Sequence, residues 1–285
     1  MVVIMKHMKL WLLVQIFVLN NSVLANTIKV ACPEGKEDFA KISRSKVYEQ
    51  VPFGSGESSV YELTWMGTKV GYGTLSVHAP IKHNGMWHRV FRAKASTGDW
   101  FEHFFVAKEK AESISFPQDF RISKFYLEQN EGKLFASPFI QQKWLEFDHE
   151  KCKVDEKIRV PEKKDRHVKN DLARGAIDAL GVAFYMRTLT YELQKKLKAP
   201  VYTSEKNWWL ELEPLAVEEI TVPAGKFKTT KIKLTTFLGK ELQQKGDVYA
   251  WIATEHENKP LVQIQGEIKI GSVWIKLHKF KPGKS

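Results

Sequence analysis

The stretch from Trp87 to Ala95 reads WHRVFRAKA and decides the fold class of this chain. Its inner part alternates apolar Phe91, Ala93 and Ala95 with charged Arg92 and Lys94, which is the period-two pattern of a half-buried β-strand. Working outward, the same alternation recurs at Tyr61-Leu63-Trp65, Phe101-His103-Phe105, Trp208-Leu210-Leu212, Ile232-Leu234, Val248-Ala250-Ile252 and Val262-Ile264. About ten strands that follow one another in sequence predict a mostly antiparallel sheet.

Two short turns support hairpins in this sheet. Met66-Gly67-Thr68 separates the strand that ends near Trp65 from a returning strand over Val70–Val77, and Gly271-Ser272 separates the last two strands. Glycine at such places favours a tight reversal of the chain. Gly71 and Gly73 stand two apart on one strand, where they allow a bend or a close backbone approach.

One segment has helical spacing. From a cap at Asn170 or Asp171, the sequence predicts a helix over Leu172 to Leu193, with Ile177, Leu180 and Phe184 on one face. Gly175 and Gly181 weaken this helix by about 1 kcal/mol each relative to alanine. Two interpretations of its apolar face stay open, a plain core contact with the sheet and a lid over a ligand cavity. The charge-rich segment from Lys151 to Lys169, just before it, is expected to be a flexible connection.

The first 25 residues are typical of a secretory signal peptide. Lys6 and Lys9 precede an apolar run from Leu10 to Leu19, and Val23-Leu24-Ala25 forms a small-residue cleavage site. The run is shorter than the roughly 20 residues that span a bilayer. We therefore expect residues 26–285 to form a single β-rich domain, soluble in the periplasm of a Gram-negative bacterium. An uncleaved anchor and lipidation at Cys32 are the alternatives.

The net charge limits the classes of partner, and the two cysteines raise the question of a disulfide. The formal net charge is +11, and for an exported protein this favours anionic envelope molecules, or plain solubility, over nucleic acid. Because the periplasm is an oxidising compartment, the two cysteines, Cys32 and Cys152, are candidates for a disulfide. Two buried free thiols are the other interpretation.

Catalytic and metal-binding patterns are weak. Ser55 lies in GSGES, which lacks the spacing of a nucleophile elbow. The run Glu255-His256-Glu257 lacks the second histidine of a zinc helix. Four strand histidines, His78, His83, His88 and His103, have no accompanying carboxylates at ligand spacing. We expect no enzyme activity, no metal and no cofactor.

Aromatic residues provide the strongest candidate site. Nine tryptophans stand in this sequence, and large rings suit either a filled core or a concave sheet face that holds an apolar ligand. Both interpretations stay open. The candidate ligand-binding residues are Trp65, Tyr72, Trp87, Phe91, Phe184, Arg187 and Trp251.

Ordered motifs across the chain resemble a bacterial family known as domain of unknown function 3108. They are DALGVAFYMR at Asp178–Arg187, EITVPAGKFKT at Glu219–Thr229, VYAWIA at Val248–Ala253, KPLV at Lys259–Val262 and KIGSV at Lys269–Val273. Phe53-Gly54-Ser55-Gly56-Glu57, followed by Tyr61, Trp65 and Gly71, also fits that family's opening. The resemblance spans about Val51 to Phe280. It implies an exported envelope protein without an established activity or catalytic residues.

These observations predict a strongly curved antiparallel sheet or half-open barrel with one packed helix. The expected function is non-enzymatic binding of an amphipathic or lipid-like envelope molecule in the concave face of the sheet. An envelope scaffold that binds another protein through a sheet edge is the first alternative. A hydrolase acting on envelope polymers is the second.

Overall fold

The structure is a computed structural model that describes residues 51–83, 85–98, 102–103, 105–133, 138–238, 241–242, 246–268 and 271–284. The expected signal peptide and Cys32 lie outside these residues. Among the described residues, no helix is both long and apolar enough to cross a membrane.

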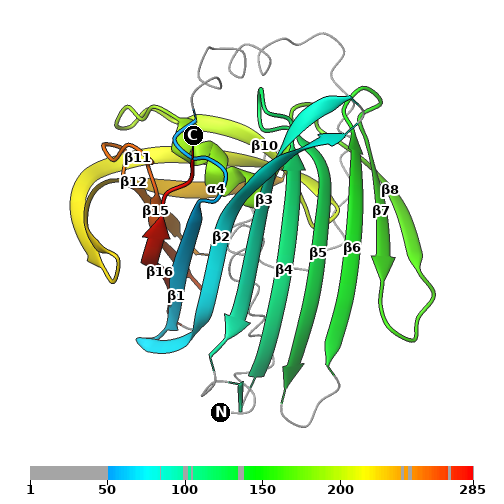
Figure 1. The fold of residues 1–285 in the computed structure, drawn as a ribbon, viewed down its shortest axis with the longest axis horizontal. Helices are drawn as coiled ribbons and strands as arrows, with labels where there is room; N and C mark the ends of the chain where they lie inside the picture. The colour runs from blue at the N-terminus through cyan, green and yellow to red at the C-terminus, as the bar shows by residue number, and fades with distance from the viewer. Residues whose placement is uncertain are drawn as a thin grey trace.

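The described strands form one sheet of sixteen strands that curls on itself and stays open (Figure 1). Its first half is a meander in chain order: β1 (Ser58–Trp65), β2 (Thr68–His83), β3 (Met86–Thr97), β4 (Phe105–Ser115), β5 (Ile122–Lys133), β6 (Phe139–Asp148), β7 (Lys153–Arg159) and β8 (Arg166–Asp171). The second half contains β9 (Ile177–Asp178), β10 (Leu197–Thr203), β11 (Lys206–Val222), β12 (Gly225–Leu238), β13 (Glu241–Leu242), β14 (Val248–Ile252), β15 (Leu261–Glu267) and β16 (Ser272–Lys281).

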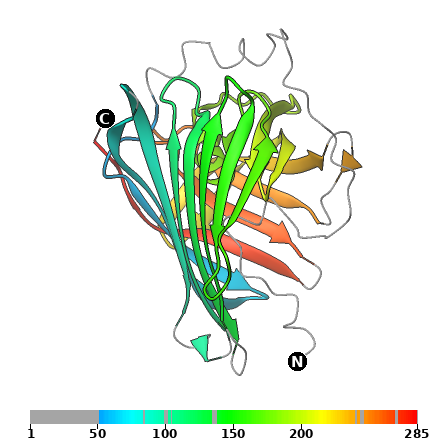
Figure 2. The same ribbon diagram turned by 90° about the vertical axis from the view of Figure 1, so that its right-hand side faces the viewer.

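The two halves join in the middle of the sheet, where β1 pairs with β16 along its whole length. β8 lies at one edge and β9 at the other, and β13 pairs only with β12. Every pairing is antiparallel except that of β9 with β10. Figure 2 shows the strands of the second half running obliquely to those of the first. The antiparallel, strongly curved sheet confirms the predicted fold class.

The main core fills the concave side of the sheet. Helix α4 (Ala179–Thr188) lies there, between the two halves of the curl, and packs against β3, β4, β9 and β10 (Figure 1). Leu63 and Leu277, from the paired β1 and β16, are each 1% exposed or less. Inward side chains alternate with outward ones along β4, as the period of two requires.

Gly71 confirms the expected close approach of two strands. It pairs with Thr97 of β3, and a Cβ at this position would lie 2.2 Å from the carbonyl oxygen of Ser96. Any side chain would therefore force β2 and β3 apart.

The predicted helix is present, but it is shorter than predicted. The helix begins at Ala179, not Leu172, and ends at Thr188, not Leu193. Gly175 has a φ of +80°, which a right-handed helix does not accommodate, and Ile177 and Asp178 pair with β10 as strand β9. Asp178, not Asn170 or Asp171, is the N-cap.

The expected flexible connection at Lys151–Lys169 was also wrong. It contains β7 and most of β8, which pair with each other from Lys153 to Asp171. Alternating Val154, Glu156 and Ile158 are buried in β7, so the period of two is present beneath the high charge. These strands help to explain why the sheet has sixteen strands and not about ten.

Candidate functional site

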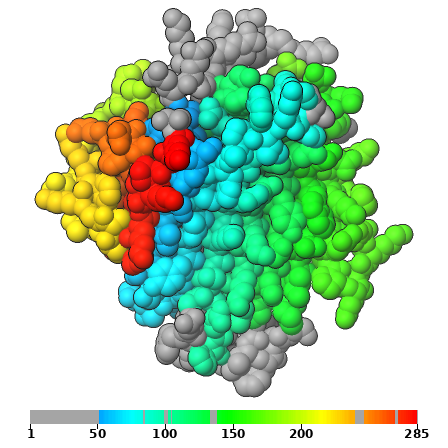
Figure 3. All heavy atoms as spheres, viewed as in Figure 1, coloured from blue at the N-terminus to red at the C-terminus, as the bar shows by residue number. Residues whose placement is uncertain are grey.

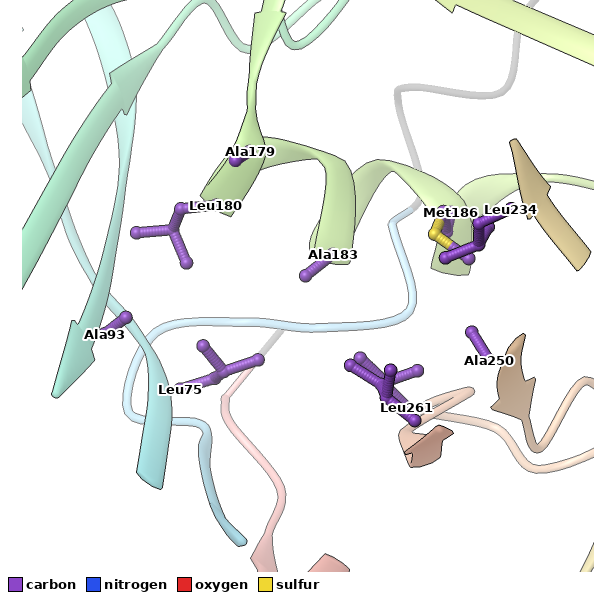
Figure 4. Close-up of a pocket in the computed structure, with 10 residues that line it drawn as sticks. Leu75, Ala93, Ala179, Leu180, Ala183, Met186, Leu234, Ala250 and Leu261 are labelled. Carbon is purple, nitrogen blue, oxygen red and sulfur yellow. The ribbon is translucent and has the colours of Figure 1, made fainter. Parts of the chain in front are cut away.

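An apolar pocket lies between α4 and the concave face of the sheet (Figure 4). Only apolar side chains line it: Leu75 and Ala93 from the first half of the sheet, Ala179, Leu180, Ala183 and Met186 from α4, and Leu234, Ala250, Leu261 and Ile264 from the second half. Its volume is about 20 Å³, close to what one water molecule needs. An acyl chain therefore fits only if α4 or the lining side chains move.

A buried carboxylate holds the N-terminal end of α4. Asp178 is 2% exposed, and its Oδ1 accepts hydrogen bonds from the backbone N–H groups of Leu180 and Gly181, both at 2.9 Å. Its Oδ2 accepts from the hydroxyl of Ser113 in β4 at 2.6 Å. Burial raises the pKa of Asp178, and these three donors oppose that shift. The cap therefore ties the start of the helix to the sheet.

A buried ion pair holds the other end. Arg187 and Glu57 are 3% and 2% exposed, and two hydrogen bonds of 2.6 and 2.9 Å join the guanidinium to the carboxylate. Arg187 also donates to the carbonyl oxygens of Lys259 and Asn258, at 3.0 and 2.7 Å. Helix α4 is thus fixed by polar contacts at both ends, on either side of the apolar pocket.

Three of the predicted ligand-binding residues meet in an aromatic cluster. The rings of Phe91 and Phe184 stack with centroids 4.1 Å apart, and the Arg187 guanidinium lies 5.6 Å from the Phe184 ring centre. Phe53 packs edge-on against both rings. Phe91 and Phe184 are at most 1% exposed and neither lines the pocket, so in this structure both are core residues.

The other four predicted residues do not join this cluster. Trp65 is partly buried against the main core. Tyr72 contacts the His278 ring, with centroids 6.0 Å apart. The Trp251 indole N–H donates to Glu218, and its ring stacks on Trp274. Trp87 is 60% exposed.

A carboxyl pair on the concave face was missed by the sequence analysis. Glu109 of β4 and Glu131 of β5 are 6% and 9% exposed. Glu109 lies between inward Ala107 and Ala111, and Glu131 pairs with Ala107 across the two strands. Burial, followed by the neighbouring Glu131, raises the pKa of Glu109 to about 9. Gln129, fully buried, is the direct cross-strand partner of Glu109. The position of Glu109 between Ala107 and Ala111, in the inward register of β4, was the available signal.

A second, larger pocket of about 860 Å³ lies where the tip of β2–β3 meets the ends of β5 to β8. His149 lines it, and burial lowers the pKa of this imidazole to about 4. The lysines at its rim already have acidic partners, as in Lys124–Glu146 at 2.8 Å and Lys151–Asp148 at 3.0 Å. The arrangement does not select a ligand charge.

The sequence analysis also considered metal ligands and a disulfide between two cysteines. Within the described residues, no three histidine, cysteine, aspartate or glutamate side chains gather in a way that could hold a metal ion. Cys152 is buried and is not a free thiol. Its predicted partner, Cys32, lies outside the described residues, so their pairing stays a prediction.

The family assignment follows from the sequence match. Residues 60–278 match a family model described as "Protein of unknown function (DUF3108)". The chain belongs to the DUF3108 family. The matched range includes α4 with Asp178 and Arg187, whereas Glu57 lies just before it. No curated protein matches this DUF3108 chain in sequence.

Solved structures share the fold of the DUF3108 chain at low identity. A β-barrel-like protein of domain of unknown function DUF1849 from Brucella abortus is 9% identical, with a TM-score of 0.54 over 81% of this chain and 99% of that one. A candidate exported protein with a YmcC-like fold from Bacteroides fragilis is 12% identical, with a TM-score of 0.34 over 81% and 98% of the two chains. The first likeness shows that this architecture also occurs outside the DUF3108 family.

Proposed function

We propose that this DUF3108 protein is exported to the periplasm and there binds an amphipathic or lipid-like envelope molecule without catalysing a reaction. The binding site is the concave face of the sheet beneath α4. The observation that supports this most directly is the pocket of Figure 4, whose ten lining residues are all apolar.

The composition of the pocket favours a removable guest over a permanently filled core. Four of the ten lining residues are alanines, Ala93, Ala179, Ala183 and Ala250, and small side chains on facing elements leave space that larger ones would fill. Ligand sites in proteins are typically concave and apolar with few polar groups. Entry of an acyl chain then requires a shift of α4 between its two polar anchors.

A space-filling substitution tests the site directly. Ala183→Leu places three extra carbon atoms on the pocket side of α4, more than the pocket of about 20 Å³ holds. It should lower uptake of a fluorescent fatty acid probe at least tenfold and lower the free energy of unfolding by about 1–3 kcal/mol. Ala79→Leu, at an exposed position of β2, is the matched control and should bind the probe as wild type does. Equal probe uptake by Ala183→Leu and wild type, or no uptake by wild type, would contradict the proposal.

Two measurements on native protein address export and the ligand. N-terminal sequencing of protein from a periplasmic extract should begin near Asn26, because Ala25 ends the predicted cleavage site. Mass spectrometry of an organic extract of the same protein should show a bound amphipathic molecule. An intact N-terminus in the membrane fraction would contradict the proposed location.

The alternative function, a scaffold that binds another protein through a sheet edge, is supported less well by the edge strand β8. β8 is the edge strand of the first half, and its sequence RHVKND has four charged or titratable side chains in six residues. Charged side chains on an edge strand oppose pairing with another chain.

A further inference from the structure

The tip of the β2–β3 hairpin has three exposed apolar side chains. Ile81, Met86 and Trp87 are 40%, 51% and 60% exposed. They belong to three consecutive pairs of the ladder, Ile81 with His88, Lys82 with Trp87, and His83 with Met86. Because Met86 and Trp87 are sequence neighbours on a strand, they point to opposite faces of the ribbon. Trp87 therefore lies on one face of the tip with Lys82, and Met86 lies on the other, which borders the larger pocket described above.

The tip extends beyond its two neighbouring strands, β1 and β4. β1 pairs with β2 only as far as Ser76, and β4 pairs with β3 only from Arg89 onward. The tip is therefore a two-stranded ribbon. The register shifts between His78 and Ile81, where Pro80 lacks a backbone donor, and such irregularities bend a strand. Figure 1 shows the ribbon sweeping over the upper ends of neighbouring strands, and Figure 3 shows its cyan atoms at the upper right margin of the surface.

The positive charge of the hairpin favours an anionic partner surface. From Leu63 to Gly98 the sequence contains no aspartate or glutamate but five basic residues, Lys69, Lys82, Arg89, Arg92 and Lys94. Lys82 is exposed at the tip beside Trp87. On the adjacent strand ends the carboxylates of Glu146 and Asp148 are neutralised by Lys124 and Lys151. The pocket beside the tip is lined by five lysine or arginine side chains and four carboxylates, so an anionic partner meets no excess negative charge here.

We propose that the β2–β3 tip docks on an anionic lipid bilayer, with Trp87, Met86 and Ile81 entering the headgroup region and Lys82 meeting lipid phosphates. Tryptophan is favoured at the membrane–water interface, and basic residues near an anionic leaflet contribute about 1 kcal/mol each. A second copy of the chain fits the tip less well, because two tips face to face would oppose Lys82 to Lys82. The proposal depends on residues apart from the pocket under α4, so it stands independently of the function proposed above.

The experiment is flotation of the mature chain with vesicles of mixed phosphatidylglycerol and phosphatidylcholine, compared with pure phosphatidylcholine. Wild type should float with the anionic vesicles. Trp87→Ser should lower the partition coefficient at least about tenfold, from the apolar area of the exposed indole. Lys82→Gln should lower it about fivefold for anionic vesicles only. Phe139→Ser, which changes a 47% exposed residue of β6, is the matched control and should float as wild type does.

Depth and folding controls complete the test. Brominated lipids should quench part of the tryptophan fluorescence of wild type, and Trp87→Phe should remove that quenched part. Circular dichroism and fatty acid uptake should be unchanged in all tip variants, which separates this proposal from the ligand site. Flotation of Trp87→Ser equal to wild type, no binding of wild type to anionic vesicles, or loss of self-association in Trp87→Ser without a vesicle effect would overturn it.

Discussion

At the scale of single residues, the core tolerates a buried arginine because its donors are matched. Arg187 makes four hydrogen bonds, two to the Glu57 carboxylate and two to backbone carbonyls. Its guanidinium also lies 4.9 Å from the centre of the Phe53 ring, which suits a cation over an aromatic face. Removal of either charged partner would leave the other charge buried without compensation.

The first prediction concerns this pair. Glu57→Ala should lower the free energy of unfolding by about 3–5 kcal/mol, because it leaves the Arg187 charge buried without its carboxylate. The double variant Glu57→Leu with Arg187→Met removes both charges and should recover part of that loss. Urea unfolding of wild type and both variants measures this. A single variant as stable as wild type would show that the pair does not hold α4.

The second prediction concerns Glu109. Its pKa is raised from 4.5 to about 9 in the folded chain, so the folded state keeps a proton that the unfolded state releases. The stability of the fold should therefore fall as the pH rises from about 5 to about 9. Glu109→Gln mimics the protonated form and should flatten this dependence. Glu112→Gln, on the outer face of β4 beside Arg92, is the control and should keep the wild-type slope. Parallel slopes for wild type and Glu109→Gln in urea titrations would contradict the prediction.

At the scale of elements, α4 is held by its ends and by its aromatic face. Phe184 is 1% exposed and stacks on Phe91, but it does not line the apolar pocket. The residues that hold the helix and the residues that could admit a guest are therefore different sets. This separation allows stability and binding to be tested independently.

The third prediction uses this separation. Phe184→Ala should lower the free energy of unfolding by about 3–5 kcal/mol, because it leaves a cavity in a close-packed cluster. Folded Phe184→Ala should still take up the fatty acid probe at low temperature. Thermal unfolding and probe titration of the same samples give the comparison. A small loss of stability with a large loss of binding would instead indicate that Phe184 belongs to a lid.

Sequence periodicity was sufficient for the sheet but not for the site. Alternation at Phe91, Ala93 and Ala95 predicted a strand because it depends only on neighbours in sequence. The partner of Arg187 could not be predicted, because Glu57 is 130 residues away and no local pattern encodes that distance. The helix start was misplaced because Asp171 and Asp178 are both suitable caps by residue type. The strand pairing of Asp171 in β8 and of Asp178 in β9, and the φ of +80° at Gly175, separate them only in the structure.

At the scale of the whole molecule, the last strand occupies the middle of the sheet. β16 lies between β1 and β15, and its inward side chains, such as Ile275 and Leu277, are fully buried. Removal of β16 would therefore expose two edges and open the main core.

The fourth prediction follows from this position. A chain that stops before Ser272 should fail to fold, because the two halves of the sheet lose the strand that joins them. A chain that stops after Pro282 should fold, since it loses only the bridge between Ser55 and Lys284 among the described strand pairings. Circular dichroism and limited proteolysis of the two truncations check this. A protease-resistant fold without β16 would contradict it.

The seam between β1 and β16 also sets an order of events for a chain that crosses a membrane N-terminus first. Ser58 pairs with Lys281, so the first described strand has no partner on one side until almost the whole chain has emerged. Contacts between such distant segments close slowly, because a long loop must be ordered first. The hairpins from β1 to β8 need only neighbouring segments of the chain, whereas the seam would close last. For a chain exported as proposed above, the sheet would therefore complete its curl only near the end of translocation.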